Sequence, residues 1–219
     1  MAYTQEDVLK ATRSLTGKTI PVHIKLAATQ VVLSQPEMRE LLSAAETIAV
    51  GACVCREEEG NCDNPVEACL ALDVETRKQI ADCAWRVISL EEALDLLEET
   101  YRLGLVHMAY RRTAIAGGGV KAGEISFVCS CCTCCCWPLT GLKRFDYHDA
   151  ITESAYVARY DEERCIGCGA CVTRCPFDAF ALFAEDERVT YSSERCFGCG
   201  LCVGMCLPGA IALQPRSDS

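Results

Sequence analysis

The chain has 219 residues, of which half are hydrophobic and 24% are charged, and its formal net charge is −10. This acidity argues against nucleic-acid binding, because contacts to phosphates rely on clustered Lys and Arg side chains. No segment approaches the roughly 20 apolar residues needed to span a bilayer, and the start MAYTQEDVLK contains no apolar signal segment, so we expect a cytoplasmic protein.

Helices and strands are mixed in residues 1–150, which we interpret as one domain. Ser34 and Glu37 form a capping box before one expected helix, Ser89 and Glu92 form another, and Gly104 ends the second of these helices. The expected helices are Gln5–Leu15, Pro36–Ala45 and Ser89–Leu103, and the expected strands are Thr47–Val54, Leu105–Tyr110 and Ile125–Cys129. This alternation predicts an α/β or α+β domain.

This domain also holds two dense groups of cysteines, which we expect to be metal ligands. The first group is Cys53, Cys55, Cys62 and Cys69, and the second is Cys129, Cys131, Cys132, Cys134, Cys135 and Cys136. Cys83 stands apart in an apolar-periodic stretch and is expected to be a buried structural thiol.

Each group lies at or just beyond the end of a predicted strand, so the two groups could converge at one edge of the domain. Because side chains alternate along a strand, Cys53 and Cys55 are expected to share a face, as are Cys129 and Cys131. The first group supplies the four thiolates that one [4Fe–4S] cluster needs, whereas the second supplies more than one cube can use.

The surplus thiols leave several interpretations open. One or two cubanes could share ligands between the groups, a non-cubane centre could have thiolates that bridge irons, or one cubane could lie beside free redox-active thiols. A metallothionein-like zinc cluster is a further alternative.

Two copies of one cysteine spacing follow at residues 151–219, which we interpret as a second, smaller domain. They read Cys165-x2-Cys168-x2-Cys171-x3-Cys175 and Cys196-x2-Cys199-x2-Cys202-x3-Cys206. Three cysteines at steps of three residues can surround three irons of a cube, and in two-cluster proteins the fourth ligand comes from the other repeat. We therefore expect Cys165, Cys168, Cys171 and Cys206 to hold one [4Fe–4S] cluster, and Cys196, Cys199, Cys202 and Cys175 to hold the other.

Competing explanations of these repeats are weaker. Zinc also binds four thiolates, but two complete sets at this spacing favour iron–sulfur clusters. The chain contains 19 cysteines, a fraction near that of small secreted disulfide scaffolds. However, an odd number leaves at least one thiol unpaired in a monomer, and the sequence gives no sign of export to an oxidising compartment.

The two repeats resemble bacterial-type 2[4Fe–4S] ferredoxins over roughly residues 157–214, where CIGCGACVTRCPFDAFAL aligns with CFGCGLCVGMCLPGAIAL without a gap. This resemblance implies a pseudo-twofold pair of short hairpins and helices that carries single electrons. The second repeat differs in having Leu207 before Pro208, where the first has Pro176 directly after its last cysteine. Gly167, Gly169, Gly198 and Gly200 are expected to let the backbone approach sulfur closely, with positive φ where needed.

A looser resemblance covers the N-terminal part. CVCR, the later Asn64-Pro65 and Cys69, GLVH and the block CSCCTCCC are similar to the cysteine-rich module that precedes ferredoxin repeats in some iron–sulfur proteins of anaerobic microbes. The catalytic subunits of heterodisulfide reductases also combine paired cysteines with a C-x2-C. Here Cys131-Cys132 would need Cys165 and Cys168 for that pattern, and both are already required by the ferredoxin repeat.

We therefore expect an α+β protein in which two ferredoxin clusters serve at least one further iron–sulfur centre in the N-terminal domain. The expected function is single-electron transfer to or from a redox partner, whose docking patch could be basic because this chain is acidic. The alternative is an oxidoreductase subunit whose N-terminal centre reduces a small molecule or a disulfide. A non-catalytic redox or metal sensor is a third interpretation. The sequence does not predict the oligomeric state.

Other signals carry less weight. The segment AGGGVKAG at 116–123 lacks the order of a phosphate-binding loop and is interpreted as a connector. His23, His107 and His148 are isolated, although His107 could provide a non-thiolate cluster ligand. Arg56 could tune a neighbouring cluster by its charge or form a surface ion pair.

Overall fold

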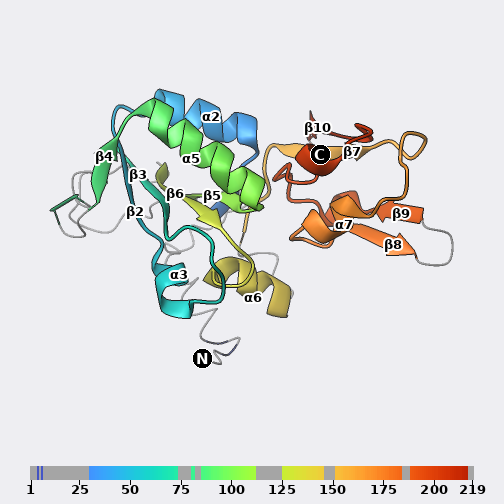
Figure 1. The fold of residues 1–219 in the computed structure, drawn as a ribbon, viewed down its shortest axis with the longest axis horizontal. Helices are drawn as coiled ribbons and strands as arrows, with labels where there is room; N and C mark the ends of the chain where they lie inside the picture. Colours follow the sequence, from blue (N-terminus) through green and yellow to red (C-terminus); the bar gives the residue numbers. More distant parts are fainter. Residues whose placement is uncertain are drawn as a thin grey trace, which may run out of the picture.

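The computed structural model describes residues 4, 6, 30–73, 80–81, 85–111, 125–145, 151–183 and 188–216. Its first part is a six-stranded sheet with two helices on one face (Figure 1). The strands are β1 (Gln30–Val32), β2 (Ile48–Ala52), β3 (Glu67–Leu72), β4 (Arg86–Ile88), β5 (Val106–Arg111) and β6 (Ile125–Cys131), in the spatial order β1-β5-β6-β3-β2-β4. Neighbouring strands of this sheet pair antiparallel, so the expected α+β class is confirmed.

The two covering helices are α2 (Gln35–Ala44) and α5 (Leu90–Leu103), which differ from the predicted bounds by one residue. The capping box of α2 is present, and the Ser89 hydroxyl accepts a hydrogen bond from the Glu92 backbone N–H at the start of α5. Gly104 ends α5 with a φ of 87°, a conformation that glycine adopts without steric cost. The helix expected at Gln5–Leu15 lies outside the described residues.

Two shorter helices, α3 (Val54–Glu59) and α6 (Trp137–Phe145), lie beyond the ends of β2 and β6 (Figure 1). The prediction of a strand through Val54 was therefore wrong at its end, because the chain turns into α3 directly after Ala52 and Cys53. Glu57 in the first turn and Gly60 at the left-handed C-terminal position stabilise this short helix.

The sheet is buried on both faces. Val31, Val50, Leu70 and Val128 belong to a core shared with α2 and α5. Val32, Val106, Met108 and Cys131 belong to a second core, to which α6 contributes Leu139. Since side chains alternate along strands, Cys69 and Cys129, which are register partners, share the second face with Cys131.

The C-terminal part is made of two small antiparallel pairs of strands with short helical turns between them. β7 (Tyr156–Tyr160) pairs with β10 (Ile211–Pro215), and β8 (Phe180–Phe183) pairs with β9 (Arg188–Tyr191). The helical turns are α7 (Ala170–Arg174), η2 (Ser193–Arg195) and η3 (Val203–Met205). The second repeat therefore has a 3₁₀ turn where the first has a short α-helix.

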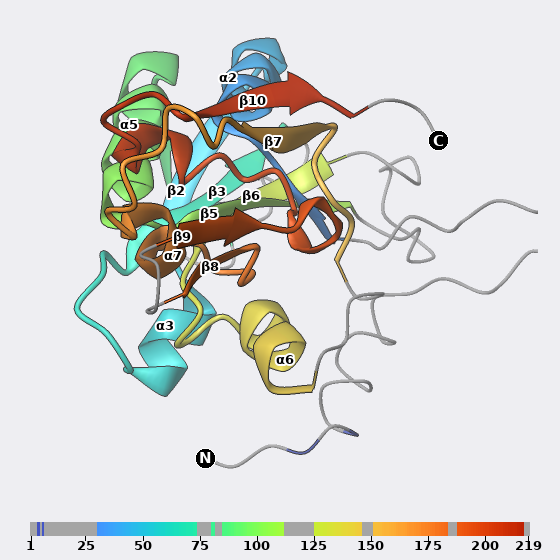
Figure 2. The same cartoon turned by 90° about the vertical axis from the view of Figure 1, so that its right-hand side faces the viewer.

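The two parts are joined by a shared core rather than by a linker alone. Phe177, Phe197 and Leu201 of the C-terminal part belong to the core on the second face of the sheet, and the rings of Phe177 and Phe197 stack with centroids 4.4 Å apart. Figure 2 views the molecule from the side of this C-terminal part, which lies in front of the sheet. This packing fixes the C-terminal part against the cysteine-bearing face of the sheet.

Hydrogen bonds reinforce that contact. The Tyr101 hydroxyl at the end of α5 donates to the Gly200 carbonyl at 2.8 Å, and Arg174 donates to the carbonyls of Tyr101 and Arg102 at 2.6 and 2.7 Å. A cation at these carbonyls also complements the negative end of the α5 dipole. Both ferredoxin-type repeats are thereby tied to one helix.

Candidate metal centres

In the C-terminal part, Cys165, Cys168, Cys171 and Cys206 line one hollow. Cys175, Cys196, Cys199 and Cys202 line a second hollow. Each hollow thus takes three cysteines from one repeat and one from the other, and each donor set fits a [4Fe–4S] cluster. We call them the outer and the inner hollow, because Cys168 in the first is exposed, whereas Cys175 and Cys199 in the second pack against the core shared with the sheet.

The backbone around both hollows follows the same pattern in the two repeats. Gly167 and Gly198 have φ values of 70° and 74°, and a Cβ at Gly198 would lie 1.9 Å from the Tyr156 carbonyl oxygen. The backbone N–H groups of Ala179 and Ala210 donate to the sulfurs of Cys175 and Cys206 at 3.4 and 3.2 Å. Such hydrogen bonds stabilise thiolates and tune the potential of a cluster that they hold.

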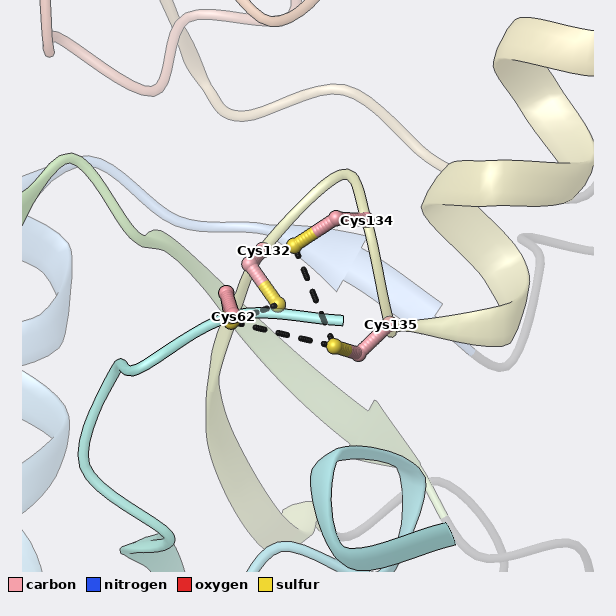
Figure 3. Close-up of side chains that lie close together, drawn as sticks. All are labelled: Cys62, Cys132, Cys134 and Cys135. Carbon is pink, nitrogen blue, oxygen red and sulfur yellow. Dashed lines mark hydrogen bonds between the residues drawn. The ribbon is translucent and has the colours of Figure 1, made fainter. Parts of the chain in front are cut away.

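In the N-terminal part, four thiols converge at one place, which we call the four-thiol site (Figure 3). It consists of Cys62, Cys132, Cys134 and Cys135, whose sulfurs all lie within 4.8 Å of one another. The Cys62 sulfur is 3.8 Å from that of Cys132 and 3.7 Å from that of Cys135. Cys132 and Cys135 are buried, whereas Cys62 and Cys134 are partly exposed. Four sulfurs at this spacing can hold a metal ion or an iron–sulfur cluster.

Side-chain amides hold the loops of this site together. Asn61 donates to the Cys134 carbonyl at 2.9 Å, and Asn64 donates to the Cys62 sulfur at 3.2 Å. Burial opposes ionisation of Cys62, but hydrogen bonds from Asn64 and its neighbouring thiols lower the pKa of that thiol to about 6. A thiol with a lowered pKa is a better metal ligand, because the thiolate is the form that binds.

The remaining six described thiols of this part form a second, connected set, which we call the six-thiol set. Its members are Cys53, Cys55, Cys69, Cys129, Cys131 and Cys136. The sulfurs of Cys69 and Cys129 are 3.3 Å apart. Cys129, Cys131 and Cys136 lie in the same core, and the Cys53 backbone N–H donates to the Val66 carbonyl, next to β3, at 2.8 Å. The set is therefore spread over the start of α3, β3, β6 and the start of α6.

The ionisation of these thiols is uneven. Hydrogen bonds from Cys55 and Cys69 lower the pKa of Cys53 to about 2, and hydrogen bonds from Cys129 and Cys136 lower that of Cys131. A hydrogen bond to Cys131 in turn raises the pKa of Cys129. Cys53 and Cys131 are therefore the thiols of this set that ionise most readily, because neighbouring thiols donate hydrogen bonds to them.

The spatial grouping differs from the grouping along the sequence. Cys62 leaves the first sequence group and joins three members of the second, while Cys53, Cys55 and Cys69 join the other three. The expected strand alternation of Cys53 and Cys55 was wrong because Cys55 lies in α3. Cys129 and Cys131 lie on the same face of β6, as predicted.

Arg56 lies between the two N-terminal sets and is only 2% exposed. Its guanidinium donates to the carbonyls of Pro65 and Ser130, the latter at 2.8 Å, and approaches the Cys132 sulfur at 3.7 Å. No ion pair between Arg56 and a carboxylate is found within the described residues. Of the two alternatives for Arg56, the surface ion pair was therefore wrong. A buried cation needs anions nearby, and the thiolates are placed to supply them.

Two further polar residues lie on β5, and only the first was singled out from the sequence. His107 is buried and bonds through Nε2 to the Thr100 hydroxyl at 3.1 Å, and burial lowers its pKa to about 3. This bond does not place it at a cysteine sulfur. Tyr110, which the sequence analysis did not single out, has its hydroxyl 3.9 Å from the Cys131 sulfur. Its spacing two residues from Met108 on β5 is the signal that could have placed it on the cysteine-bearing face. Cys83, His23, His148 and the segment 116–123 lie outside the described residues.

The fold and the hollows of the C-terminal part define an iron–sulfur binding module of ferredoxin type. A family described as a 4Fe-4S dicluster domain matches residues 148–213. No curated protein is found to match the chain. None of the described helices is both long enough and apolar enough to cross a membrane.

Proposed function

We propose that this chain is an electron-transfer protein with two [4Fe–4S] clusters in its C-terminal module and at least one further iron–sulfur centre in its N-terminal domain. The observation that carries the proposal is the shared core, in which Cys175 and Cys199 of the inner hollow pack together with Cys129, Cys131 and Cys136. Redox centres held by these two sets would be separated only by packed side chains.

In this proposal, the eight C-terminal cysteines are the cluster ligands in the two sets that line the hollows. A bound [4Fe–4S] cluster supplies reversible one-electron chemistry. The chain supplies thiolates, backbone N–H donors to the sulfurs, and an apolar core that excludes water around the inner hollow. The N-terminal thiols supply the ligands of the additional centre, and the four-thiol site is the most compact group among them.

The outer hollow is the proposed point of contact with a redox partner. Cys168 is exposed there, and the acidic residues Asp161, Glu162 and Glu163 lie just before Arg164 and Cys165 in the sequence. Together with the net charge of −10, these carboxylates favour a partner with a basic docking patch. The proposed route therefore runs from the outer hollow through the inner hollow to the N-terminal domain.

A reductive titration of the full-length protein, purified without oxygen and followed by EPR, tests this function. We expect about three or more one-electron equivalents per chain, because two clusters accept about two and the N-terminal centre accepts the rest. Cys135→Ala should lose the N-terminal equivalent, whereas Thr133→Ala in the same loop should keep it. The proposal would be contradicted if the wild type took up only about two equivalents. It would also be contradicted if Cys135→Ala took up as many equivalents as the wild type.

The same titration addresses a second candidate function. Cys62 and Cys134 are partly exposed, so the four-thiol site is accessible from solvent. An oxidoreductase subunit acting on a small molecule or disulfide would need such access and an open coordination position. A shift of the N-terminal EPR signal on addition of cyanide would favour this candidate, and an unchanged signal would favour electron transfer.

A further inference from the structure

We propose that the N-terminal domain holds two separate metal centres, and that the six-thiol set is a polynuclear iron–sulfur site distinct from the four-thiol site. This inference deepens the proposed function and rests on it for the identity of the metal. It is carried by the partition of ten thiols into two spatial sets, of which only the four-thiol site is a compact group of four.

The first argument is convergence from separate segments. β3 and β6 are far apart in sequence, yet their pairing places Cys69 opposite Cys129 with the sulfurs 3.3 Å apart. The start of α3 lies beside β3, since the Cys53 backbone N–H donates to the Val66 carbonyl at 2.8 Å, and Cys136 packs with Cys131 in one core. A buried cysteine commonly packs as a small hydrophobic side chain. Here the sulfurs of Cys69 and Cys129 instead lie in contact across two strands, next to Cys131 and Cys136.

The second argument concerns the size of the set. A zinc ion takes four thiolates in tetrahedral geometry, and one [4Fe–4S] cube also takes four. The six thiols are spread over the start of α3, β3, β6 and the start of α6, and among the described residues no group of them is as compact as the four-thiol site. An extended set suits a centre with several irons better than a single ion.

The third argument is charge. Arg56 is buried beside Cys132 of the four-thiol site and follows Cys55 of the six-thiol set in sequence. One buried cation shared by two thiolate-rich sets is consistent with two anionic centres side by side, since a buried charge is retained only where opposite charges compensate it.

The location gives the six-thiol set a place in the proposed route. Cys129, Cys131 and Cys136 pack in the same core as Cys175 and Cys199 of the inner hollow. The four-thiol site instead packs with Leu105 in a separate small core. The six-thiol set therefore shares a core with the inner hollow, whereas the four-thiol site belongs to another core.

Iron analysis of three full-length variants, purified without oxygen, tests the inference. Cys69→Ala/Cys129→Ala removes two thiols of the six-thiol set, and Cys62→Ala/Cys134→Ala removes two of the four-thiol site. Val128→Ala is the matched control, because it opens space in β6 next to Cys129 without removing a thiol. The EPR signals of the C-terminal clusters serve in each sample as an internal measure of folding.

We expect the wild type to hold more than about twelve irons per chain, of which about eight belong to the two C-terminal clusters. Each double variant should lose a different part of the remaining iron, and Val128→Ala should lose none. Retention of all wild-type iron by Cys69→Ala/Cys129→Ala would overturn the inference. It would also be overturned if Cys62→Ala/Cys134→Ala alone reduced the count to about eight, although the proposed function would then stand. A wild-type count of about eight would instead refute the proposed function itself.

Discussion

Arg56 is the residue that most directly links the fold to the chemistry of the thiols. It is buried, has hydrogen bonds to two carbonyls, and lies 3.7 Å from the Cys132 sulfur. Its positive charge should stabilise the more negative, reduced form of a centre at the four-thiol site. Arg56 should therefore raise the reduction potential of that centre.

Replacing Arg56 with Met tests this role. Loss of one charge several ångströms away, at an effective dielectric constant of about 20, is expected to lower the N-terminal potential by roughly 100 mV. Arg56→Lys keeps the charge and should recover most of the shift. Arg86→Met is the control, because Arg86 is half-exposed and pairs with Glu67 and Glu92. An EPR-monitored potentiometric titration in which Arg56→Met and Arg86→Met give the same potential would contradict this role.

At the scale of elements, the start of α2 connects the sheet domain to the C-terminal module. The Glu37 carboxylate accepts hydrogen bonds from the backbone N–H and the hydroxyl of Ser34 at 2.8 and 2.6 Å. It also accepts from the Ser154 hydroxyl at 2.5 Å and the Ala155 N–H at 3.1 Å. One side chain thus caps a helix and holds the segment that leads into β7.

Glu37→Ala should therefore cost more stability than loss of an ordinary capping residue. We expect the free energy of unfolding to fall by about 2 kcal/mol, since the cap and two hydrogen bonds between the parts are lost together. Glu92→Ala at the equivalent position of α5 is the matched control and should cost less than about 1 kcal/mol. Denaturant unfolding under anaerobic conditions measures both, and equal losses would show that Glu37 acts only as a cap.

The elements that the sequence predicts well are those set by local patterns. The caps at Ser34 and Ser89, the stop at Gly104 and the strands at β5 and β6 all follow from neighbouring residues. α3 was missed because its six residues directly follow an apolar strand, although the run Arg56–Glu59 and Gly60 carry a helix and a stop signal.

The partition of the thiols could not be predicted in this way. It depends on which strands become neighbours, and the pairing of β3 with β6 skips β4, α5 and β5 in sequence. Alternation on β6 sends Cys129 and Cys131 to one face, but only the turn after that strand carries Cys132 to Cys62. The C-terminal sets could be predicted because three of the four cysteines in each set lie within one short repeat, and the ferredoxin pattern supplies the fourth from the other repeat.

At the scale of the whole molecule, the C-terminal part packs in front of the sheet (Figure 2). Cys168 of the outer hollow is exposed, whereas Cys175 and Cys199 of the inner hollow pack with Cys129, Cys131 and Cys136 in the core on the second face of the sheet. The shared core and the bonds from Tyr101 and Arg174 keep the two parts in a fixed relation. Fixed spacing suits electron transfer.

The central claim is that this chain carries iron–sulfur chemistry beyond its two ferredoxin-type clusters. Iron and acid-labile sulfide counted per chain, on full-length protein purified without oxygen, test it most directly. The account predicts about twelve or more irons with a matching amount of sulfide, since each cube contributes about four of each. About eight irons with about eight sulfides, or zinc in place of the additional iron, would contradict it.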